Sequence, residues 1–148
     1  MYSSLNTNRT EMKLLIINGV NLSLLGSREV DIYGCTEFED YLASLRSKYP
    51  EVHLDYLQTD KVEEIAAAIT GAKGVDGIIL NPGAYTHTSI VIADAIKAVP
   101  VRVVEVHISN LFGREQFRRH SFIAPACAGS ISGFGLKGYE LALLSFIH

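Results

Sequence analysis

Short runs of β-branched and other apolar residues alternate along the chain with longer segments whose apolar side chains recur at helical spacing. Apolar runs of this length indicate strands buried on both faces, and a helix between successive strands requires parallel pairing. The pattern predicts an α/β fold with a flavodoxin-like, doubly wound, five-stranded parallel sheet and helices on both faces. We expect strands at 13–18, 52–57, 77–81, 101–108 and 130–133, and helices at about 38–49, 62–72, 87–99 and 138–147.

Length and composition predict one soluble globular domain. The 148 residues, 48% hydrophobic and 20% charged, are enough to bury a core without disulfides. Residues 1–11 are polar and lack the apolar core of a signal peptide, so we expect a disordered extension before a single domain at 12–148. No apolar run reaches membrane-spanning length, which predicts a cytoplasmic protein without a membrane partner.

Charge and cysteine content exclude further classes. The net charge of −3 leaves no basic footprint, so nucleic acid is not an expected partner. Cys35 and Cys127 make no disulfide framework, and no CxxC pair suggests a metal site. We therefore expect two reduced thiols and no metal.

The loop after the first strand, at 18–34, is unusually long for a connection from strand to helix. Loops of this length in a compact domain are usually lids or binding loops. Arg28 and Tyr33 lie five positions apart on it, and a nearby guanidinium favours the phenolate that would make Tyr33 a base. From spacing alone, a surface arginine and a tyrosine that anchors the loop form the commoner alternative.

The third strand ends in a second polar loop. Asn81 offers a donor and an acceptor there, and Thr86 or Thr88 is expected to cap the following helix. His87 and Asp94 share one face of that expected helix, seven residues apart. They are candidates to bind a polar ligand or to meet a neighbouring subunit, and a solvated polar stripe is the alternative.

The fourth strand carries a carboxylate and a histidine on the same face. Period-two alternation places Glu105 and His107 side by side near the end of a buried strand. The carboxylate would orient the imidazole and favour its protonated form, which suits a proton donor. A satisfied structural pair is the alternative, although burying such a pair has a desolvation penalty.

A polar segment follows the fourth strand. Ser109 and Asn110 are candidate caps of a following helix, whose N–H groups suit a carboxylate. Arg114 and Arg118 would lie one turn apart on that helix, an unfavourable pair unless an anion lies opposite. Screening by solvent or pairing with Glu115 is the alternative. Taken together, the loops suit abstraction of a proton α to a carbonyl with acid-assisted loss of a hydroxyl.

Four separated segments resemble the conserved blocks of type II 3-dehydroquinate dehydratases, at 16–34, 80–89, 105–121 and 128–143. The resemblance extends from Met12 to His148. It implies reversible conversion of 3-dehydroquinate to 3-dehydroshikimate through an enolate, without a Schiff base, cofactor or metal. It also implies a homo-oligomer, a dodecamer of four trimers. The same reaction serves the shikimate pathway of chorismate and aromatic amino-acid biosynthesis or, as the alternative, quinate breakdown.

The resemblance also implies roles for individual residues. Tyr33 would be the base, with Arg28 keeping it ionised, and Asn21 would hold a water at the enolate oxygen. His107 would be the general acid that protonates the departing hydroxyl, oriented by Glu105. Asp94 would reach a neighbouring subunit's site, and the backbone at 108–109 would hold the substrate carboxylate. The substrate-binding set that the resemblance implies is Asn81, His87, Asp94, Ile108, Ser109 and Arg118.

The chain departs from the family pattern at Val20 and Val30, where proline is usual. Proline stiffens a loop, so we expect a more mobile lid and an effect on KM without loss of chemistry. A non-catalytic receiver or flavin-binding module is the main rival on this fold. However, the first strand ends in Asn18 without the acidic cluster of a receiver, and the loop lacks hydroxyls for a flavin phosphate.

A Schiff-base dehydratase is the second rival, and it needs a buried lysine. The sequence places its lysines mainly at element edges, with none in the loops described above: Lys13, Lys48, Lys61, Lys73, Lys97 and Lys137.

Overall fold

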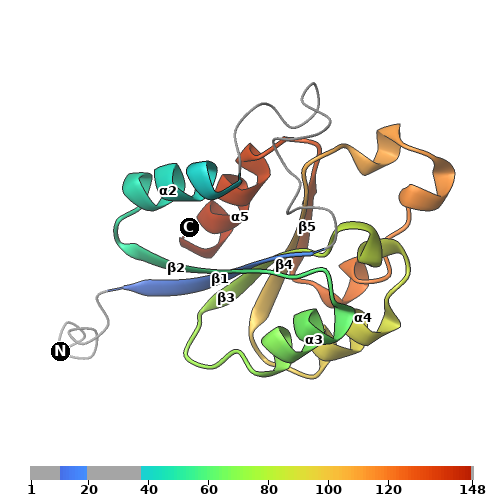
Figure 1. Ribbon diagram of the computed structural model, residues 1–148, viewed down its shortest axis with the longest axis horizontal. Helices are drawn as coiled ribbons and strands as arrows, with labels where there is room; N and C mark the ends of the chain where they lie inside the picture. Colours follow the sequence, from blue (N-terminus) through green and yellow to red (C-terminus); the bar gives the residue numbers. More distant parts are fainter. Residues whose placement is uncertain (1–10, 20–37, 148) are drawn as a thin grey trace.

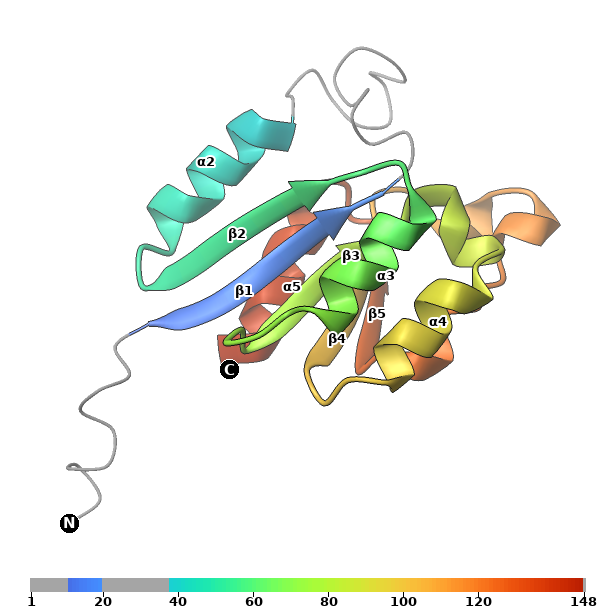
Figure 2. The same ribbon diagram turned by 60° about the horizontal axis from the view of Figure 1, so that its bottom comes forward.

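A computed structural model describes residues 11–19 and 38–147 of the chain. Its centre is a five-stranded sheet in the order β2-β1-β3-β4-β5, with every neighbouring pair parallel (Figures 1 and 2). The strands are β1 (Met12–Asn18), β2 (Val52–Gln58), β3 (Gly77–Asn81), β4 (Arg102–His107) and β5 (Gly129–Ser132). The predicted flavodoxin-like, doubly wound architecture is confirmed, and every expected strand is present.

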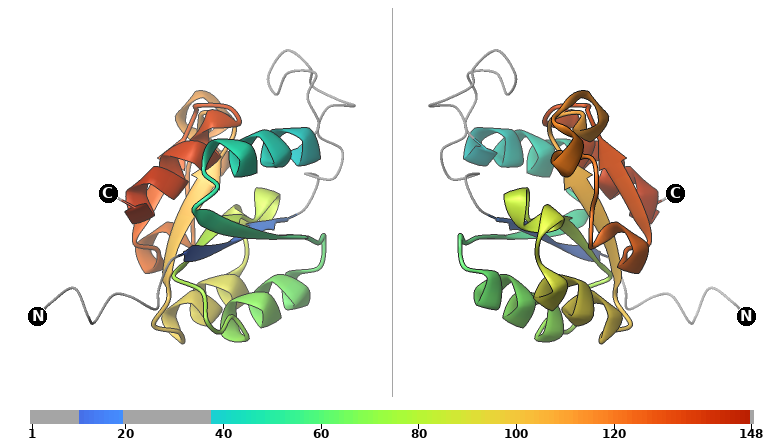
Figure 3. Two further views of the ribbon diagram at one scale, coloured as in Figure 1. Left: turned by 90° about the vertical axis from the view of Figure 1, so that its left-hand side faces the viewer. Right: turned by 90° about the vertical axis from the view of Figure 1, so that its right-hand side faces the viewer.

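Two helices cover each face of the sheet. In Figures 1 and 3, α2 (Phe38–Lys48) and α5 (Lys137–Ile147) lie on one face, and α3 (Val62–Thr70) and α4 (Ile90–Lys97) lie on the other. A separate apolar core fills each side, and all five residues of β3 are buried between them. Within the described residues, no helix combines the length and apolar character needed to cross a bilayer.

The expected helix at 87–99 is wrong at its start. A 3-10 helix, η3 (Gly83–His87), comes first, and α4 begins only at Ile90. Its cap is Ser89, whose Oγ accepts a hydrogen bond of 3.0 Å from the Ile92 N–H, and neither Thr86 nor Thr88 has this role. His87 therefore precedes the α-helix and does not share a helix face with Asp94.

The prediction of a helix directly after β4 is also wrong. Two single 3-10 turns, η4 (Leu111–Gly113) and η5 (Gln116–Arg118), stand in its place. Asn110 caps η4, since its Oδ1 accepts from the Phe112 N–H at 3.1 Å, but no α-helix follows to offer a row of free N–H groups. A third short turn, η6 (Ala124–Ala126), leads into β5.

The winding direction reverses between β1 and β3, because the chain adds β2 on one side of β1 and then crosses to add β3 on the other. In such folds, ligands bind beyond the carboxyl ends of the strands at this reversal. The chain is tightly packed there: a Cβ on Gly19 would lie 2.5 Å from the Pro82 carbonyl oxygen, so only glycine fits. We call this side of the sheet its carboxyl edge.

Candidate active site

A buried carboxylate lies near the carboxyl edge of the sheet. Val103 packs in the core under α3 and α4, whereas Val104 and Val106 pack under α2 and α5. The alternation of β4 therefore directs Glu105 and His107 toward the α3/α4 side. Glu105 is fully buried and His107 almost so.

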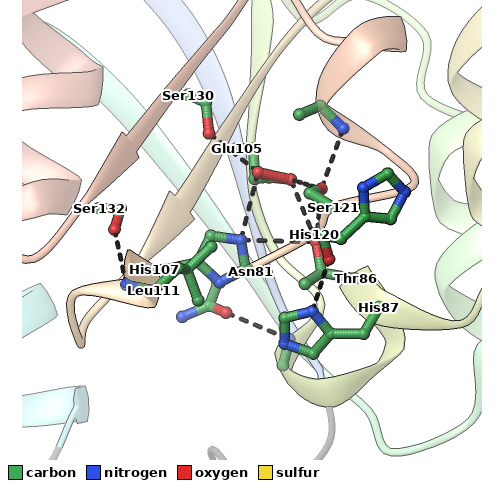
Figure 4. A network of polar contacts seen from close by, with 12 residues as sticks. Asn81, Thr86, His87, Glu105, His107, Leu111, His120, Ser121, Ser130 and Ser132 are labelled. Carbon is green, nitrogen blue, oxygen red and sulfur yellow. Dashed lines mark hydrogen bonds and ion pairs between the residues drawn. The ribbon is translucent and has the colours of Figure 1, made fainter. Parts of the chain in front are cut away.

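The predicted pairing of these two residues is present in the structure. The His107 Nε2 lies 3.3 Å from the Glu105 Oε1, and Figure 4 shows the two side chains at the centre of a polar cluster. Because a carboxylate can only accept, the proton of a neutral His107 is favoured on Nε2. This tautomer leaves Nδ1 unprotonated, so Nδ1 is the ring atom that can take up and release a proton.

Three hydroxyl groups from separate segments complete the surroundings of Glu105. Oε2 accepts from the Ser121 Oγ at 2.6 Å and from the Thr86 Oγ1 at 3.1 Å, while Oε1 accepts from the Ser130 Oγ at 2.8 Å. Sequence reasoning assigned no contact with Glu105 to any of the three. We call this group the acid cluster: Thr86, Glu105, His107, Ser121 and Ser130.

These contacts keep Glu105 ionised in the interior. Burial alone would raise its pKa, but the hydrogen bond and charge of His107, together with the bonds from Ser121 and Ser130, outweigh burial and lower the pKa below its ordinary value. The charge of Glu105 is therefore stabilised by one titratable ring and by neutral hydroxyls. The Glu105 carboxylate therefore holds the His107 ring in place through Nε2.

A second polar group lies on the opposite side of the same edge. The Tyr139 hydroxyl, on α5, accepts from the Asn81 Nδ2 at 2.9 Å and donates to the Asn18 Oδ1 at 2.7 Å. The Asn18 Nδ2 in turn donates to the Tyr56 hydroxyl at 3.3 Å. We call these four residues the amide network. Sequence reasoning identified Asn81 as a site residue but assigned no role to Tyr139.

Three other residues of the predicted site, His87, Ile108 and Ser109, are held by hydrogen bonds or by burial. The His87 Nδ1 donates to the His120 carbonyl at 2.7 Å, so the Nε2 of a neutral ring is the acceptor. The Ser109 Oγ accepts from the Arg114 Nη1 at 3.3 Å, and Ile108 is buried in the core.

Arg114 and Arg118 do not form the predicted pair on one helix face. The Arg118 Nε lies 3.1 Å from the Glu115 Oε2, although it makes no hydrogen bond within the described part of the chain. Its guanidinium also lies over the Phe117 ring, 5.1 Å from the centroid. Pairing with Glu115, the alternative expected from the sequence, is therefore present.

Asp94 lies outside the acid cluster. It is exposed on α4, and none of the described contacts joins it to Glu105 or His107. Three residues of the predicted site, Asn21, Arg28 and Tyr33, fall outside the described residues, as do Val20 and Val30.

Every lysine of the chain is described, and every one is exposed. A Schiff-base dehydratase needs a buried amine, so this finding argues against that rival. Among the residues that the structure describes, no three His, Cys, Asp or Glu side chains are grouped so as to hold a metal ion.

Comparison with known proteins places these features in a family. The sequence model of the family described as dehydroquinase class II matches residues 12–147. The 3-dehydroquinate dehydratase of Caldicellulosiruptor saccharolyticus is 53% identical over 135 residues, which cover 88% of this chain and 93% of the relative. The 3-dehydroquinate dehydratase of Campylobacter jejuni is 48% identical over 139 residues, 92% of this chain and 87% of the relative.

Solved structures agree with the sequence relatives. The type II dehydroquinase from Butyrivibrio crossotus superposes with a TM-score of 0.87 at 42% identity, covering 93% of this chain and 99% of that one. The type II dehydroquinase from Propionibacterium acnes has a TM-score of 0.85 at 40% identity, covering 91% and 97% of the two chains. The chain therefore belongs to the class II dehydroquinase family.

Proposed function

We propose that this chain catalyses the reversible elimination of water from 3-dehydroquinate, which yields 3-dehydroshikimate through an enolate. Family membership makes the chain a hydro-lyase. The observation that carries the proposal is the Glu105 carboxylate, fully buried and held against His107 near the carboxyl end of β4. Acid-assisted loss of a hydroxyl needs an oriented proton donor beside the leaving group, and a carboxylate held against a histidine ring can orient one.

His107 is the general acid in this proposal. Its Nε2 is held by Glu105, so Nδ1 is the atom that gives its proton to the departing hydroxyl. After the transfer, the neutral ring retains its Nε2 proton, which points at the carboxylate. Glu105 thus orients the ring and stabilises the cation that exists before the transfer.

The base in this proposal is Tyr33, by resemblance to the family. The substrate C–H bond breaks and its proton goes to the Tyr33 phenolate, while Arg28 keeps that tyrosine ionised and Asn21 holds a water at the enolate oxygen. The C–O bond then breaks, and the hydroxyl leaves as water with the proton from His107. Solvent finally carries a proton from Tyr33 to His107, which restores both groups.

The substrate contacts in this proposal also follow the resemblance. Two features support them. Because the His87 Nδ1 is held by a carbonyl, its Nε2 can face a substrate hydroxyl. Among residues 11–19 and 38–147, the one ion pair of Arg118 is with Glu115. The backbone at 108–109 would bind the substrate carboxylate. The residues proposed to contact substrate within one subunit are Asn81, His87, Ile108, Ser109 and Arg118.

The test is the growth of enone-carboxylate absorbance when purified protein meets 3-dehydroquinate. We expect turnover by the parent and collapse of kcat in Tyr33→Phe and His107→Ala. Rates should stay near-parental in Tyr49→Phe, since Tyr49 precedes β2 and its hydroxyl bonds Glu140, outside the acid cluster and the amide network. A folded parent without turnover would refute the reaction. Inactivation by borohydride in the presence of substrate would refute the enolate mechanism without a Schiff base.

We further propose that the active form is a dodecamer of four trimers in which Asp94 reaches a neighbour's site. The exposed Asp94 shares α4 with Ile90 and Val91, whose side chains are 64% and 55% exposed, and such apolar exposure is typical of a contact surface. Val91→Lys should reduce both the sedimenting mass and kcat. Full activity in a monomer would exclude this arrangement.

The cellular role we propose is the shikimate pathway of aromatic amino-acid biosynthesis, in the cytoplasm. Deletion of the gene in its host should then impose a requirement for aromatic amino acids. Loss of growth on quinate alone, with no such requirement, would favour the catabolic alternative.

A further inference from the structure

The Tyr139 hydroxyl joins two asparagine side chains that end neighbouring strands. Asn18 and Asn81 lie opposite each other in the register of β1 and β3, and all three side chains are almost fully buried. Tyr139 also packs its ring against Phe38, with a centroid distance of 4.8 Å. The ring therefore has a structural role that the hydroxyl does not share.

The directions of the hydrogen bonds constrain the Asn81 amide. Tyr139 has one hydroxyl proton, which it donates to the Asn18 Oδ1, so toward Asn81 it can only accept. On the other side, the Asn81 Oδ1 accepts from the Gly83 N–H at 3.1 Å. A flipped amide would place Nδ2 against that N–H and would compete with Asn18 for the hydroxyl proton.

Burial strengthens this constraint. Burial raises the pKa of Tyr139 far above its ordinary value, so the hydroxyl stays protonated and its pattern of one donated and one accepted bond does not change near neutral pH. An unmade hydrogen bond in such a site is costly, because water does not replace the lost partner. The amide of Asn81 thus has a single orientation. One N–H is committed to Tyr139, and the other has no partner within the described part of the chain.

We propose that Tyr139 is a positioning residue, whose hydroxyl fixes the Asn81 amide so that its uncommitted N–H is presented to a hydroxyl of the substrate ring. This inference rests on the proposed function and on the proposed contact of Asn81 with substrate. It is supported by the place of Asn81, which ends β3 next to the strand of the acid cluster, with Leu80 opposite Glu105.

The experiment is a double-mutant cycle of Tyr139→Phe and Asn81→Ala, with kcat and KM measured for 3-dehydroquinate. Tyr139→Phe keeps the ring and removes the hydroxyl, so we expect KM to rise about tenfold, equivalent to one hydrogen bond, with a smaller change in kcat. In the Asn81→Ala background the same substitution should change KM by less than about twofold, because the group that it positions is gone.

A structural role alone predicts a different pattern. Loss of the hydroxyl would then lower the free energy of unfolding and the yield of active protein, and any change in KM would be the same in both backgrounds. Tyr49→Phe is the matched control, since it removes a part-buried hydroxyl bond of 2.6 Å to Glu140 that belongs to neither the acid cluster nor the amide network. It should leave KM unchanged.

The outcomes separate this inference from the proposed function. Additive effects in the cycle, or an unchanged KM in Tyr139→Phe when Asn81→Ala is impaired, would overturn the positioning role and leave the reaction intact. An active parent with unchanged KM in Asn81→Ala would overturn both the proposed substrate contact and the positioning role. A parent without turnover would overturn the proposed function itself, and the inference with it.

Discussion

The acid cluster and the amide network lie at the same edge of the sheet, on opposite faces, and they are built from different chemistry. The acid cluster surrounds an ionised carboxylate with a titratable ring and three hydroxyls. The amide network contains only neutral amides and phenols. The difference suggests a division of labour, in which one face transfers a proton and the other holds hydrogen-bonding groups in fixed orientations.

The sharpest way to test this division is to remove the charge of the acid cluster. Glu105→Gln keeps the side-chain shape but cannot stabilise the imidazolium, so we expect kcat to fall about 100-fold or more, in the usual range for general acid catalysis. The matched change in the amide network, Tyr56→Phe, should lower kcat by less than about threefold, since it removes a neutral bond at the network's end. Similar losses in the two variants would contradict the division.

A second comparison concerns stability. Ser121→Ala removes the shortest hydrogen bond to a buried carboxylate, and such bonds contribute about 1.5–3 kcal/mol to the free energy of unfolding. Ser44→Ala is the control, because its hydroxyl donates to the Tyr41 carbonyl at an exposed site, and a change within about 0.5 kcal/mol is expected. Denaturant titration measures both. Equal effects would mean that Ser121 does not stabilise the carboxylate.

The acid cluster and the amide network should lose their contributions to stability at opposite ends of the pH scale. The pKa of Glu105 is lowered in the fold, so the unfolded chain takes up the proton first as the pH falls below about 4.5, and stability is lost there. The pKa of Glu140 is also lowered, first by its hydrogen bond from Lys48, and adds to this loss. Glu105→Gln should therefore flatten the acid limb of stability against pH without abolishing it.

At alkaline pH, stability falls as the pH rises. The pKa of Tyr139 is raised in the fold, so stability is fully present below about pH 10 and falls as the unfolded chain loses its phenolic proton. Burial also raises the pKa of Tyr41, to about 12, so part of the alkaline limb belongs to that residue. Tyr139→Phe should flatten this limb and leave the acid limb unchanged. An unchanged alkaline limb would contradict the role of Tyr139.

The smallest expected effect is a change in the labelling rate of Cys127, whose thiol reports on the charge of the acid cluster. Burial, and then the charge of Glu105, raise the pKa of this thiol to about 12, so it should react slowly with thiol reagents at neutral pH. In a Cys35→Ser background, Glu105→Gln should speed labelling of native Cys127 by about two- to fivefold, since the smaller of the two causes is removed. An unchanged labelling rate would mean that the charge of Glu105 does not affect the pKa of the Cys127 thiol.

The sequence predicted the parts of this molecule that follow a local rule. Apolar runs predicted all five strands, and the period of a strand predicted the pairing of Glu105 with His107. The helix starting at Ile90 was predicted three residues too early, because apolar periodicity cannot separate a 3-10 turn from a first α-helical turn. The helix after β4 was wrong for the same reason: the spacing of Arg114 and Arg118 suited an α-helix, and two 3-10 turns are present.

The rest could not be predicted because it depends on contacts between distant segments. Thr86, Ser121 and Ser130 converge on Glu105 from η3, from the segment after η5 and from β5, and they share no spacing. Thr86 was expected to cap a helix, although its hydroxyl bonds the carboxylate. From the sequence, Tyr139 is one more aromatic residue of a helix. Its role depends on the packing of α5 against β3 and β4, which brings the hydroxyl to Asn81 and Asn18.

One hydrogen bond described above has a consequence for the order in which the molecule is assembled during synthesis. The hydrogen bond between Tyr139 and Asn18 spans 121 positions of the chain, whereas each hydroxyl bond to Glu105 spans 25 or fewer. Contacts of long separation carry the greater loop-closure entropy and tend to form late in folding. A nascent chain can therefore assemble the acid cluster before α5 emerges, whereas the end of β1 is completed only when the last helix packs.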